Sequence, residues 1–233
     1  MDDSRWVTRF RPAAGWKAVV ACWVGLSLGL GLALADPVVE LKELEAKALA
    51  GEGASQLALA LRYDGRERSD DRDPVKAFHW YKEAAGKGYA EAQAALGLLY
   101  MKGEGTVEDQ AEGARWFRQA SEQGDPVAQL NLASCYANGH GVTKDLKEAA
   151  RWFRESAERN EPMAQYYLGI LYGRGEGVPQ SYIEAYKWLT ASAAQGVKAA
   201  RASLETLDSV LSAGELEAAR KAAASMRLSL VGR

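Results

Sequence analysis

The sequence contains two cysteines, Cys22 and Cys135, and two histidines, His79 and His140. These residue types often supply nucleophiles, general bases and metal ligands. A nucleophile works beside a base, and a structural zinc ion takes four ligands. His79 directly precedes Trp80, whereas His140 lies between two glycines. Neither context forms a recognisable catalytic or metal-binding motif.

Longer catalytic motifs are also absent from the sequence, which has no Ser-x-x-Lys, Cys-x-x-Cys or His-Glu-x-x-His. Its paired glycines, such as Gly103 and Gly105, follow a predicted helix rather than a strand, so they lack the context of a dinucleotide-binding loop. We therefore predict no catalytic residue, no cofactor and no metal. We interpret His79 as a solvated helix residue, His140 as a loop tip and Cys135 as a small buried apolar residue.

The charge balance restricts the class of partner. The 233 residues include 29 Lys+Arg and 31 Asp+Glu, for a formal net charge of −2. Nucleic-acid binding usually requires a strongly basic surface. We therefore predict no nucleic-acid partner, and membrane contact only through the N-terminal segment. The groove described below predicts another protein or peptide segment as the partner.

Residues 1–35 have the pattern of an export signal. An uncharged run at 18–35 ends in Ala-Leu-Ala and follows four basic residues: Arg5, Arg9, Arg11 and Lys17. The run is longer than most cleaved signals and just shorter than a comfortable membrane span. A cleaved signal peptide and a retained inner-membrane anchor both stay open. In either case, the positive flank predicts that the chain after residue 35 is periplasmic.

Internal similarity dominates the rest of the chain. Four tryptophans follow one another at intervals of 36 residues: Trp80, Trp116, Trp152 and Trp188. Four tyrosines follow the same period with one extra residue in the first unit: Tyr63, Tyr100, Tyr136 and Tyr172. A period of this length is typical of a solenoid, in which one unit cannot bury its apolar face without its neighbours.

Each unit is predicted to form two helices, named helix A and helix B. In helix A, Ala92, Leu96 and Tyr100 lie at positions i, i+4 and i+8 on one face. Helix B is predicted to start at an N-cap seven residues before the Trp: Asp73, Asp109, Asp145 and Ser181. It is predicted to end at a residue that tolerates positive φ: Gly88, Gly124, Asn160 and Gly196.

The predicted fold is all-α, with four helix-pair repeats over 54–200. Their approximate bounds are 54–89, 90–125, 126–161 and 162–197. A capping helix precedes them at 36–53, and capping helices with a tail follow at 201–233. The C-terminal region contains an apolar stripe: Leu204, Leu207, Val210 and Leu211. Ser212 and Glu215 then predict a capping box for a last helix through about Ser225.

The recurrent residues are predicted to pack between repeats, because large rings at helical spacing usually bury area between helices. The predicted repeat core is Tyr63, Trp80, Leu96, Tyr100, Trp116, Leu132, Tyr136, Trp152, Leu168, Tyr172 and Trp188. Non-recurrent residues of helix A are predicted to line a partner-binding groove. The groove residues are Leu98, Met101, Leu130, Asn131, Ser134, Tyr166, Tyr167 and Ile170. Packing of these residues against the next helix pair is the open alternative.

Helix B carries a row of basic residues, here called the basic ridge: Lys82, Arg115, Arg118, Arg151, Arg154 and Lys187. Glutamates lie three or four residues from several of them, so pairing along the helix predicts a largely neutralised outer face. Docking of an acidic partner on the ridge is the alternative.

The repeat resembles a known family. The pattern Ala-x-x-x-Leu-Gly-x-x-Tyr, then Gly-x-Gly, Asp and Ala-x-x-Trp-Phe, is similar to the Sel-one-like (Sel1-like) subclass of tetratricopeptide repeats, over about 150 residues in four copies. The resemblance implies a right-handed superhelix of helix pairs that acts as an adaptor between proteins. For an exported bacterial member, it implies a role in envelope assembly, secretion or signalling regulation.

The resemblance leaves three functional hypotheses. The first is a non-enzymatic periplasmic scaffold. The second is a cell-wall or β-lactam hydrolase, because one exported branch of the family is linked to β-lactam hydrolysis. That branch carries a disulfide in every repeat, and this sequence lacks the cysteine pairs. The third is a periplasmic inhibitor of a signalling receptor.

Overall fold

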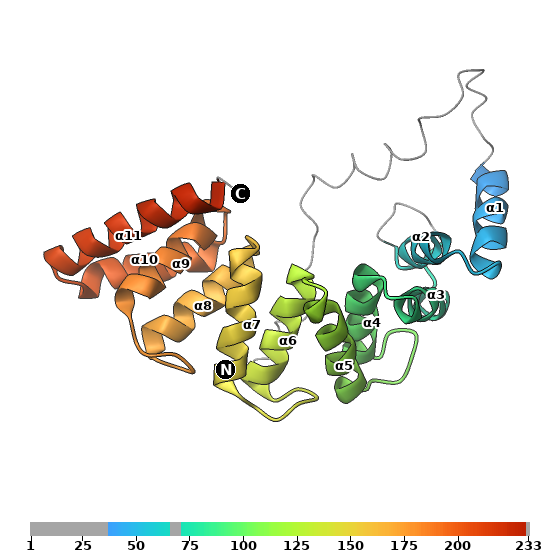
Figure 1. The fold of residues 1–233 in the computed structure, drawn as a ribbon, viewed down its shortest axis with the longest axis horizontal. Helices are drawn as coiled ribbons and strands as arrows, with labels where there is room; N and C mark the ends of the chain where they lie inside the picture. Colours follow the sequence, from blue (N-terminus) through green and yellow to red (C-terminus); the bar gives the residue numbers. More distant parts are fainter. Residues whose placement is uncertain (1–36, 66–70, 232–233) are drawn as a thin grey trace, which may run out of the picture. The chain divides into compact units, whose positions relative to one another are not determined.

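A computed structural model describes residues 37–65 and 71–231, and every regular element in these two ranges is an α-helix (Figure 1). The helices are α1 (Pro37–Leu49), α2 (Gly53–Tyr63), α3 (Pro74–Gly86), α4 (Ala90–Lys102), α5 (Gln110–Glu122), α6 (Pro126–Asn138), α7 (Leu146–Glu158), α8 (Pro162–Arg174), α9 (Tyr182–Ala194), α10 (Lys198–Val210) and α11 (Ala213–Val231). The prediction of an all-α chain is confirmed. The predicted signal peptide or anchor lies outside the described residues.

The chain divides into two units, Met1–Glu40 and Leu41–Arg233. Of the first unit, the described residues include only the first turn of α1. The second unit contains the rest of α1 and all the other helices, and the contacts given below lie within it.

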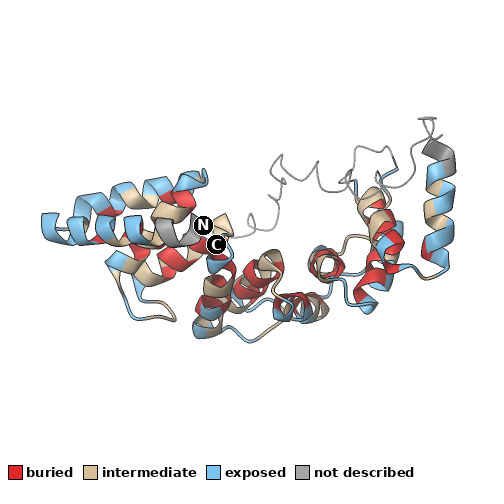
Figure 2. Cartoon of the chain, turned by 45° about the horizontal axis from the view of Figure 1, so that its top comes forward, coloured by how far each residue is buried: buried red, intermediate tan, exposed pale blue. Residues whose placement is uncertain are grey.

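Consecutive helices of the second unit pack in pairs. The four predicted pairs are α2 with α3, α4 with α5, α6 with α7 and α8 with α9, and the second helix of each pair also packs against the helix that follows it. Buried residues line the helix sides that face a neighbour (Figure 2). This is the arrangement of an α-helical solenoid. Helix A is therefore α2, α4, α6 or α8, and helix B is α3, α5, α7 or α9.

Helix B starts at the predicted residues. Four side chains cap these helices by accepting hydrogen bonds from first-turn amides: Asp73, Asp109, Asp145 and Ser181. In the second repeat, Asp109 accepts from the backbone N–H of Glu112 at 3.0 Å. The backbone N–H of Asp109 donates to the carbonyl oxygen of Tyr100 at 2.9 Å. The last turn of helix A thus fixes the first residue of helix B.

The paired glycines between helices A and B have two different roles. Gly139 follows α6 with a φ of 80°, and its N–H donates to the carbonyl oxygen of Cys135 at 2.8 Å. Gly141 has a φ of 71°, and a Cβ atom there would lie 1.9 Å from the carbonyl oxygen of Gln110 in the preceding repeat. The second glycine therefore allows two repeats to approach backbone to backbone. The residue pattern predicts the positive φ but not this contact.

A buried glutamine in each helix A joins successive repeats. The set is Gln56, Gln93, Gln129 and Gln165, each at most 4% exposed. Each Nε2 group donates to a backbone carbonyl eight residues earlier, at the end of the preceding helix, over 3.1–3.2 Å. Each of these carbonyls also accepts a hydrogen bond from the backbone N–H three residues later, as Ala157 does from Asn160 at 3.0 Å. The glutamine row therefore adds a second hydrogen bond at each helix end and ties each helix A to the helix before it.

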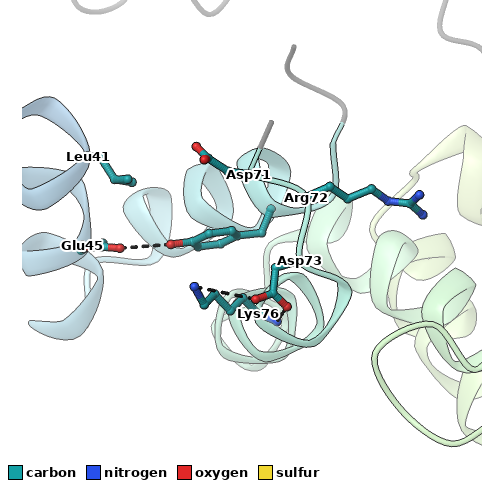
Figure 3. Close-up of a pocket in the computed structure, with 7 residues that line it drawn as sticks. Leu41, Glu45, Asp71, Arg72, Asp73 and Lys76 are labelled. Carbon is teal, nitrogen blue, oxygen red and sulfur yellow. Dashed lines mark hydrogen bonds and ion pairs between the residues drawn. The ribbon is translucent and has the colours of Figure 1, made fainter. Parts of the chain in front are cut away.

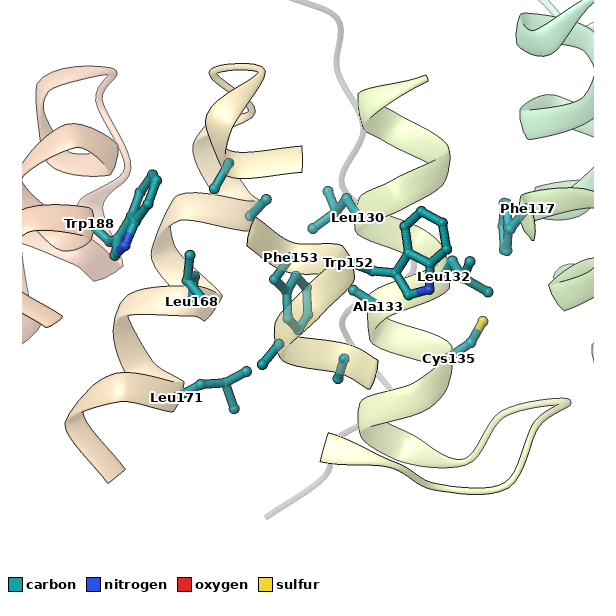
Figure 4. Packing of buried hydrophobic residues seen from close by; sticks show 14 of the residues in the cluster. Phe117, Leu130, Leu132, Ala133, Cys135, Trp152, Phe153, Leu168, Leu171 and Trp188 are labelled. Carbon is teal, nitrogen blue, oxygen red and sulfur yellow. The ribbon is translucent and has the colours of Figure 1, made fainter. Parts of the chain in front are cut away.

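The leucines of the predicted core are fully enclosed, since Leu96, Leu132 and Leu168 are each 0% exposed. Trp152 of α7 lies over α6 beside Leu132 (Figure 4). Trp152 and Trp188 are both 7% exposed.

The remaining predicted core residues are buried to different degrees. Tyr63 is buried, whereas five aromatic residues are half-buried at the margin of the packed clusters: Trp80, Tyr100, Trp116, Tyr136 and Tyr172. All eleven predicted core residues thus belong to, or pack against, a cluster of buried side chains.

The C-terminal helices depart from the repeat pattern. α11 packs mainly against α9 rather than against α10, which precedes it. The α10 position equivalent to Gly97 and Gly169, where helix B approaches helix A closely, is the exposed Glu205. A charged side chain at this contact disfavours pairing of α10 with a helix B.

Two details of the C-terminal prediction need correction. Val210 is 63% exposed and does not belong to the apolar stripe, because it is the last residue of α10. The last helix ends at Val231 rather than near Ser225. The capping box is present: the backbone N–H of Ser212 donates to Glu215 Oε2 at 3.0 Å.

Candidate functional site

The predicted groove residues do not form one exposed surface. Leu130 is only 4% exposed and belongs to a central cluster of buried residues that includes Trp152 and Leu168, so its assignment as an accessible groove residue is wrong. Its position in helix A faces the next repeat. Leu98 and Met101 are half-buried against the same cluster.

Tyr166 and Ile170 of α8 are half-buried against a different set of residues. That cluster includes Ala200 and Leu207 of α10 and Ala219 of α11. These two side chains therefore pack largely against the helices that follow their own repeat, which is the alternative that the sequence left open. Tyr166 is consequently a weaker candidate for a partner contact than the sequence suggested.

Tyr167 lies against the repeat before its own. Its ring centroid is 5.2 Å from that of Phe153 in α7, and burial raises the pKa of Tyr167 to about 12. The side chain is nevertheless half-buried rather than enclosed. In α6, Asn131 and Ser134 are also half-buried, and each donates to a carbonyl of its own helix, at 2.9 and 3.0 Å.

Half-buried residues of successive A helices share one register. We define the helix-A strip as these residues: Leu98, Val127, Asn131, Ser134, Met163, Tyr167 and Ile170. Within α6 and α8, they lie at positions i, i+4 and i+7, which share one helix face. Val127 and Met163 were missed by the sequence analysis. They lie one helical turn before Asn131 and Tyr167, so the helical period itself could have identified them.

Six of the seven strip residues lie on α6 and α8, two helices that carry almost no charge. α6 contains no Asp, Glu, Lys or Arg, and the charged residue of α8 is Arg174 at its last position. The B helices differ, because α5 and α7 carry charged residues on their exposed sides. An uncharged strip suits contact with apolar and neutral hydrogen-bonding groups rather than with ions.

The side chains considered for chemistry lie apart. Cys135 is 3% exposed, and burial raises the pKa of its thiol to about 12, which suppresses the reactive thiolate. His79 and His140 are exposed. Within residues 37–65 and 71–231, no three His, Cys, Asp or Glu side chains are grouped closely enough to hold a metal ion.

A polar hollow of about 410 Å³ lies beside α1, α2 and α3 (Figure 3). Seven residues line it: Leu41, Glu45, Tyr63, Asp71, Arg72, Asp73 and Lys76. The Tyr63 hydroxyl donates to Glu45 at 3.0 Å, and Lys76 lies 3.7 Å from Asp73. Asp71 and Arg72 form ion pairs with residues outside the lining, Arg62 and Glu104. The lining contains no Cys, Ser or His that could act as a nucleophile with a base.

Half of the basic ridge is neutralised, which is less than the largely neutralised face that the sequence predicted. Three of its residues form ion pairs with a glutamate three positions earlier: Arg115 with Glu112, Arg151 with Glu148 and Lys187 with Glu184.

The described helices include none that is both long and apolar enough to cross a bilayer.

Comparison with known proteins places the repeats in a family. The Sel1 repeat model matches residues 53–89, 90–125, 126–161 and 162–197, which together make up more than half of the chain. A crystal structure of c5321, described as a protective antigen of uropathogenic Escherichia coli with an SLR fold, is 38% identical, with a TM-score of 0.65 over 69% of this chain. A Sel1 repeat protein from Oxalobacter formigenes is 32% identical, with a TM-score of 0.65 over 74% of this chain. The matched regions span 34% and 50% of those two proteins.

Proposed function

Because the chain belongs to the Sel1 repeat family, we propose that it acts as a non-enzymatic scaffold that binds another protein along the helix-A strip. Sel1 repeats generally mediate protein–protein interaction, and the fold of this chain is that of a repeat scaffold. The proposal adds the surface used and the character of the segment it binds.

The observation that carries the proposal is the absence of a charged face on the middle A helices. A helix face exposed to solvent normally carries charged as well as polar residues. α6 carries no charged residue, and Val127, Asn131 and Ser134 on its strip face are half-buried. A partner segment with an apolar or neutral surface, such as one face of an amphipathic helix, would cover them.

Crosslinking tests which surface is used. A photoreactive amino acid is placed at Tyr167 or Ser134 on the strip and, as the matched control, at Glu122 or Glu158 on exposed turns of helix B. We expect both strip positions to capture the same protein in cells and the control positions not to. The captured protein, once purified, should bind the intact chain and lose affinity for Ser134→Arg. Equal capture from both surfaces would contradict the assignment.

We also propose that the chain is exported and acts in the periplasm, in envelope assembly or signalling regulation. This rests on the basic residues before the apolar run at 18–35 and on the small residues that end it. Fusion of alkaline phosphatase after residue 60 should give an active enzyme, whereas fusion of a cytoplasmic reporter should not. The mass of the mature N-terminus distinguishes cleavage after Ala35 from a retained anchor.

A hydrolase finds no support in the described residues. The thiol of Cys135 is buried, and the two histidines lie on the surface without an adjacent nucleophile. The scaffold proposal predicts no turnover of a chromogenic β-lactam or of labelled peptidoglycan by the purified chain. Turnover that survives further purification would contradict it.

A further inference from the structure

We propose that α11 is a displaceable helix that covers one end of the partner-binding surface, and that an amphipathic helix of the partner, with two alanine-sized residues on its buried face, takes its place. The inference rests on the proposed function, because it names the chemistry of the partner that binds the helix-A strip. α11 itself shows which helix pattern fits this surface.

One face of α11 meets both clusters on which the α8 part of the strip packs. The residues of this face lie at positions i, i+3, i+7 and i+10 of the helix: Leu216, Ala219, Ala223 and Met226. The first three belong to, or pack against, the cluster that contains Leu207 of α10, and Ile170 of the strip packs against the same cluster. Met226 packs against the central cluster, as Met163 and Tyr167 of the strip do. α11 therefore shares its packing environment with the end of the strip.

α11 is held by little buried apolar area. Among the α11 side chains that the structure describes, the buried ones are two alanines, Ala219 at 0% and Ala223 at 6% exposed, and Leu216 is half-buried. Helix α7 inside the solenoid, in contrast, buries Trp152 and Phe153. The free energy gained by burial increases with the apolar area removed from water. Docking of α11 therefore contributes less free energy than docking of a helix inside the solenoid.

A small polar cluster adds to the docking of α11. The Tyr186 hydroxyl of α9 donates to Asp208 Oδ1 of α10 at 3.3 Å, and Arg220 Nη2 of α11 lies 3.7 Å from the same oxygen. The side chains of Asp208 and Arg220 are 41% and 60% exposed, and ion pairs in contact with solvent contribute little to stability. This cluster therefore orients α11 more than it fixes it.

α11 can leave its site as an intact helix. Its capping box uses only local residues, because the backbone N–H and the hydroxyl of Ser212 donate to Glu215 Oε2 at 3.0 and 2.6 Å. Six of its 19 residues are alanine, the residue with the highest helix propensity. Leu211, which joins α10 to Ser212, is extended, with φ −80° and ψ 140°. A rotation at Leu211 therefore moves α11 without unfolding α10.

The packing of α11 indicates the kind of helix that replaces it. Its two buried residues are alanines four positions apart, and their cluster also contains Ala193 of α9 and Ala200 of α10. Small side chains on both sides allow helices to approach closely. A fitting partner helix has small residues at positions i and i+4 and larger apolar residues at i−3 and i+7. Recognition of such spaced residues is typical of an amphipathic helix in an apolar groove.

A fluorescent peptide with the sequence of residues 212–231 is the probe, and its binding to the full chain is measured by anisotropy. The test variant is Ala219→Glu, which places a charge at the buried contact and releases α11. The matched control is Ala218→Glu, which adds the same charge at an exposed position of the same helix. A covered surface binds its ligand in proportion to the fraction of open molecules. We therefore expect the test variant to bind the peptide about tenfold or more tightly than the native chain, and the control within about twofold of it.

A second variant opens the site without changing the buried face. Asp208→Asn with Arg220→Gln removes the ion pair of α11 and should raise the affinity for the peptide by a smaller factor, with an unchanged circular dichroism spectrum. A peptide that itself carries Ala219→Glu should bind none of these chains. The absence of a gain in the folded variants would overturn the inference, and so would equal binding of the two peptides.

Two measurements connect α11 with the partner. A photoreactive amino acid at Ile170 of the Ala219→Glu chain should crosslink to the peptide, and one at Glu158 should not. The protein captured from Tyr167 and Ser134 should bind the Ala219→Glu chain more tightly than the native chain and compete with the peptide. Equal affinity for both chains, without competition, would overturn the inference and leave the scaffold proposal standing. Failure of the strip positions to capture a protein would contradict the proposed function and this inference together.

Discussion

Replacement of Gly141 by alanine tests whether the junction between repeats depends on contact between their backbones. Gly141 has a φ of 71°, and the added Cβ would lie 1.9 Å from the carbonyl oxygen of Gln110 and 2.8 Å from the amide nitrogen of Ala111. These are backbone atoms at the start of α5, so no side-chain rotation relieves the clash. The loop must move away from the second repeat.

Two other glycines allow the conformational cost of a left-handed residue to be separated from the steric cost of the added Cβ. Gly196 has a φ of 92°, and a Cβ added there would meet no atom within 4 Å, so Gly196→Ala measures the cost of the left-handed conformation, about 1–2 kcal/mol. Gly86 has neither a positive φ nor a close neighbour, so Gly86→Ala should be neutral or stabilising by up to about 1 kcal/mol. Gly141→Ala adds a steric cost of about 1–3 kcal/mol to the conformational cost, for a total of about 2–5 kcal/mol.

Urea unfolding of the three variants, followed by circular dichroism, measures these differences in the free energy of unfolding. A loss of about 2–5 kcal/mol is a large part of the roughly 5–15 kcal/mol by which a typical domain is stable. We expect the order Gly86→Ala, native chain, Gly196→Ala, Gly141→Ala, from most to least stable. Equal losses in the free energy of unfolding for Gly141→Ala and Gly196→Ala would show that the backbone contact between repeats adds no steric cost, and would contradict the prediction.

Four further predictions concern buried and half-buried residues. Gln165→Leu should cost about 1–3 kcal/mol, because it removes the hydrogen bond that the side chain donates to the carbonyl of Ala157 and the one that it accepts from Gln195; an unchanged urea midpoint would contradict this. Trp152→Ala should cost about 3–5 kcal/mol and abolish folding and binding together, so a stable variant that selectively loses binding would show a direct contact with the partner. Burial raises the pKa of the Asp125 and Glu161 carboxyls in the folded chain. The folded state therefore binds these protons more tightly than the unfolded state, and stability should fall as pH rises through their folded-state pKa values. Asp125→Asn, which still caps α6, should make that fall shallower in urea titrations across the acidic range. Cys135 should react with a thiol reagent at a mildly alkaline pH only after unfolding, because burial raises its pKa to about 12; rapid labelling of the native chain would show that the third repeat opens.

Local residue patterns predicted most helix boundaries correctly. Asp109 and Asp145 cap α5 and α7, and Asn160 adopts the expected positive φ of 66°. These features depend on a side chain and the backbone within a few residues of it, so a single sequence contains the information. The role of Gln165 was different, since its recurrence was visible but its carbonyl partner became known only when the two helices were placed side by side.

Burial was the property that the sequence described least well. Leu130 and Tyr167 both occupy helix-A positions whose residue differs between repeats, so the sequence made both of them candidates for a partner contact. In the structure Leu130 is 4% exposed and Tyr167 is half-buried. Position 130 faces the next repeat, whereas Tyr167 lies against Phe153 of the preceding one. The difference depends on the angle between neighbouring helices, which no single helix encodes.

A period of 36 residues, the helix caps and the paired glycines predicted four stacked helix pairs, because these signals act locally or repeat regularly along the chain. The tertiary structure alone decided that Arg118 and Arg154 bond to tyrosines of the next repeat rather than to glutamates, and that α11 packs on α9. Both outcomes depend on which side chains and helices come within contact distance of one another, and those distances exist only once the repeats have packed.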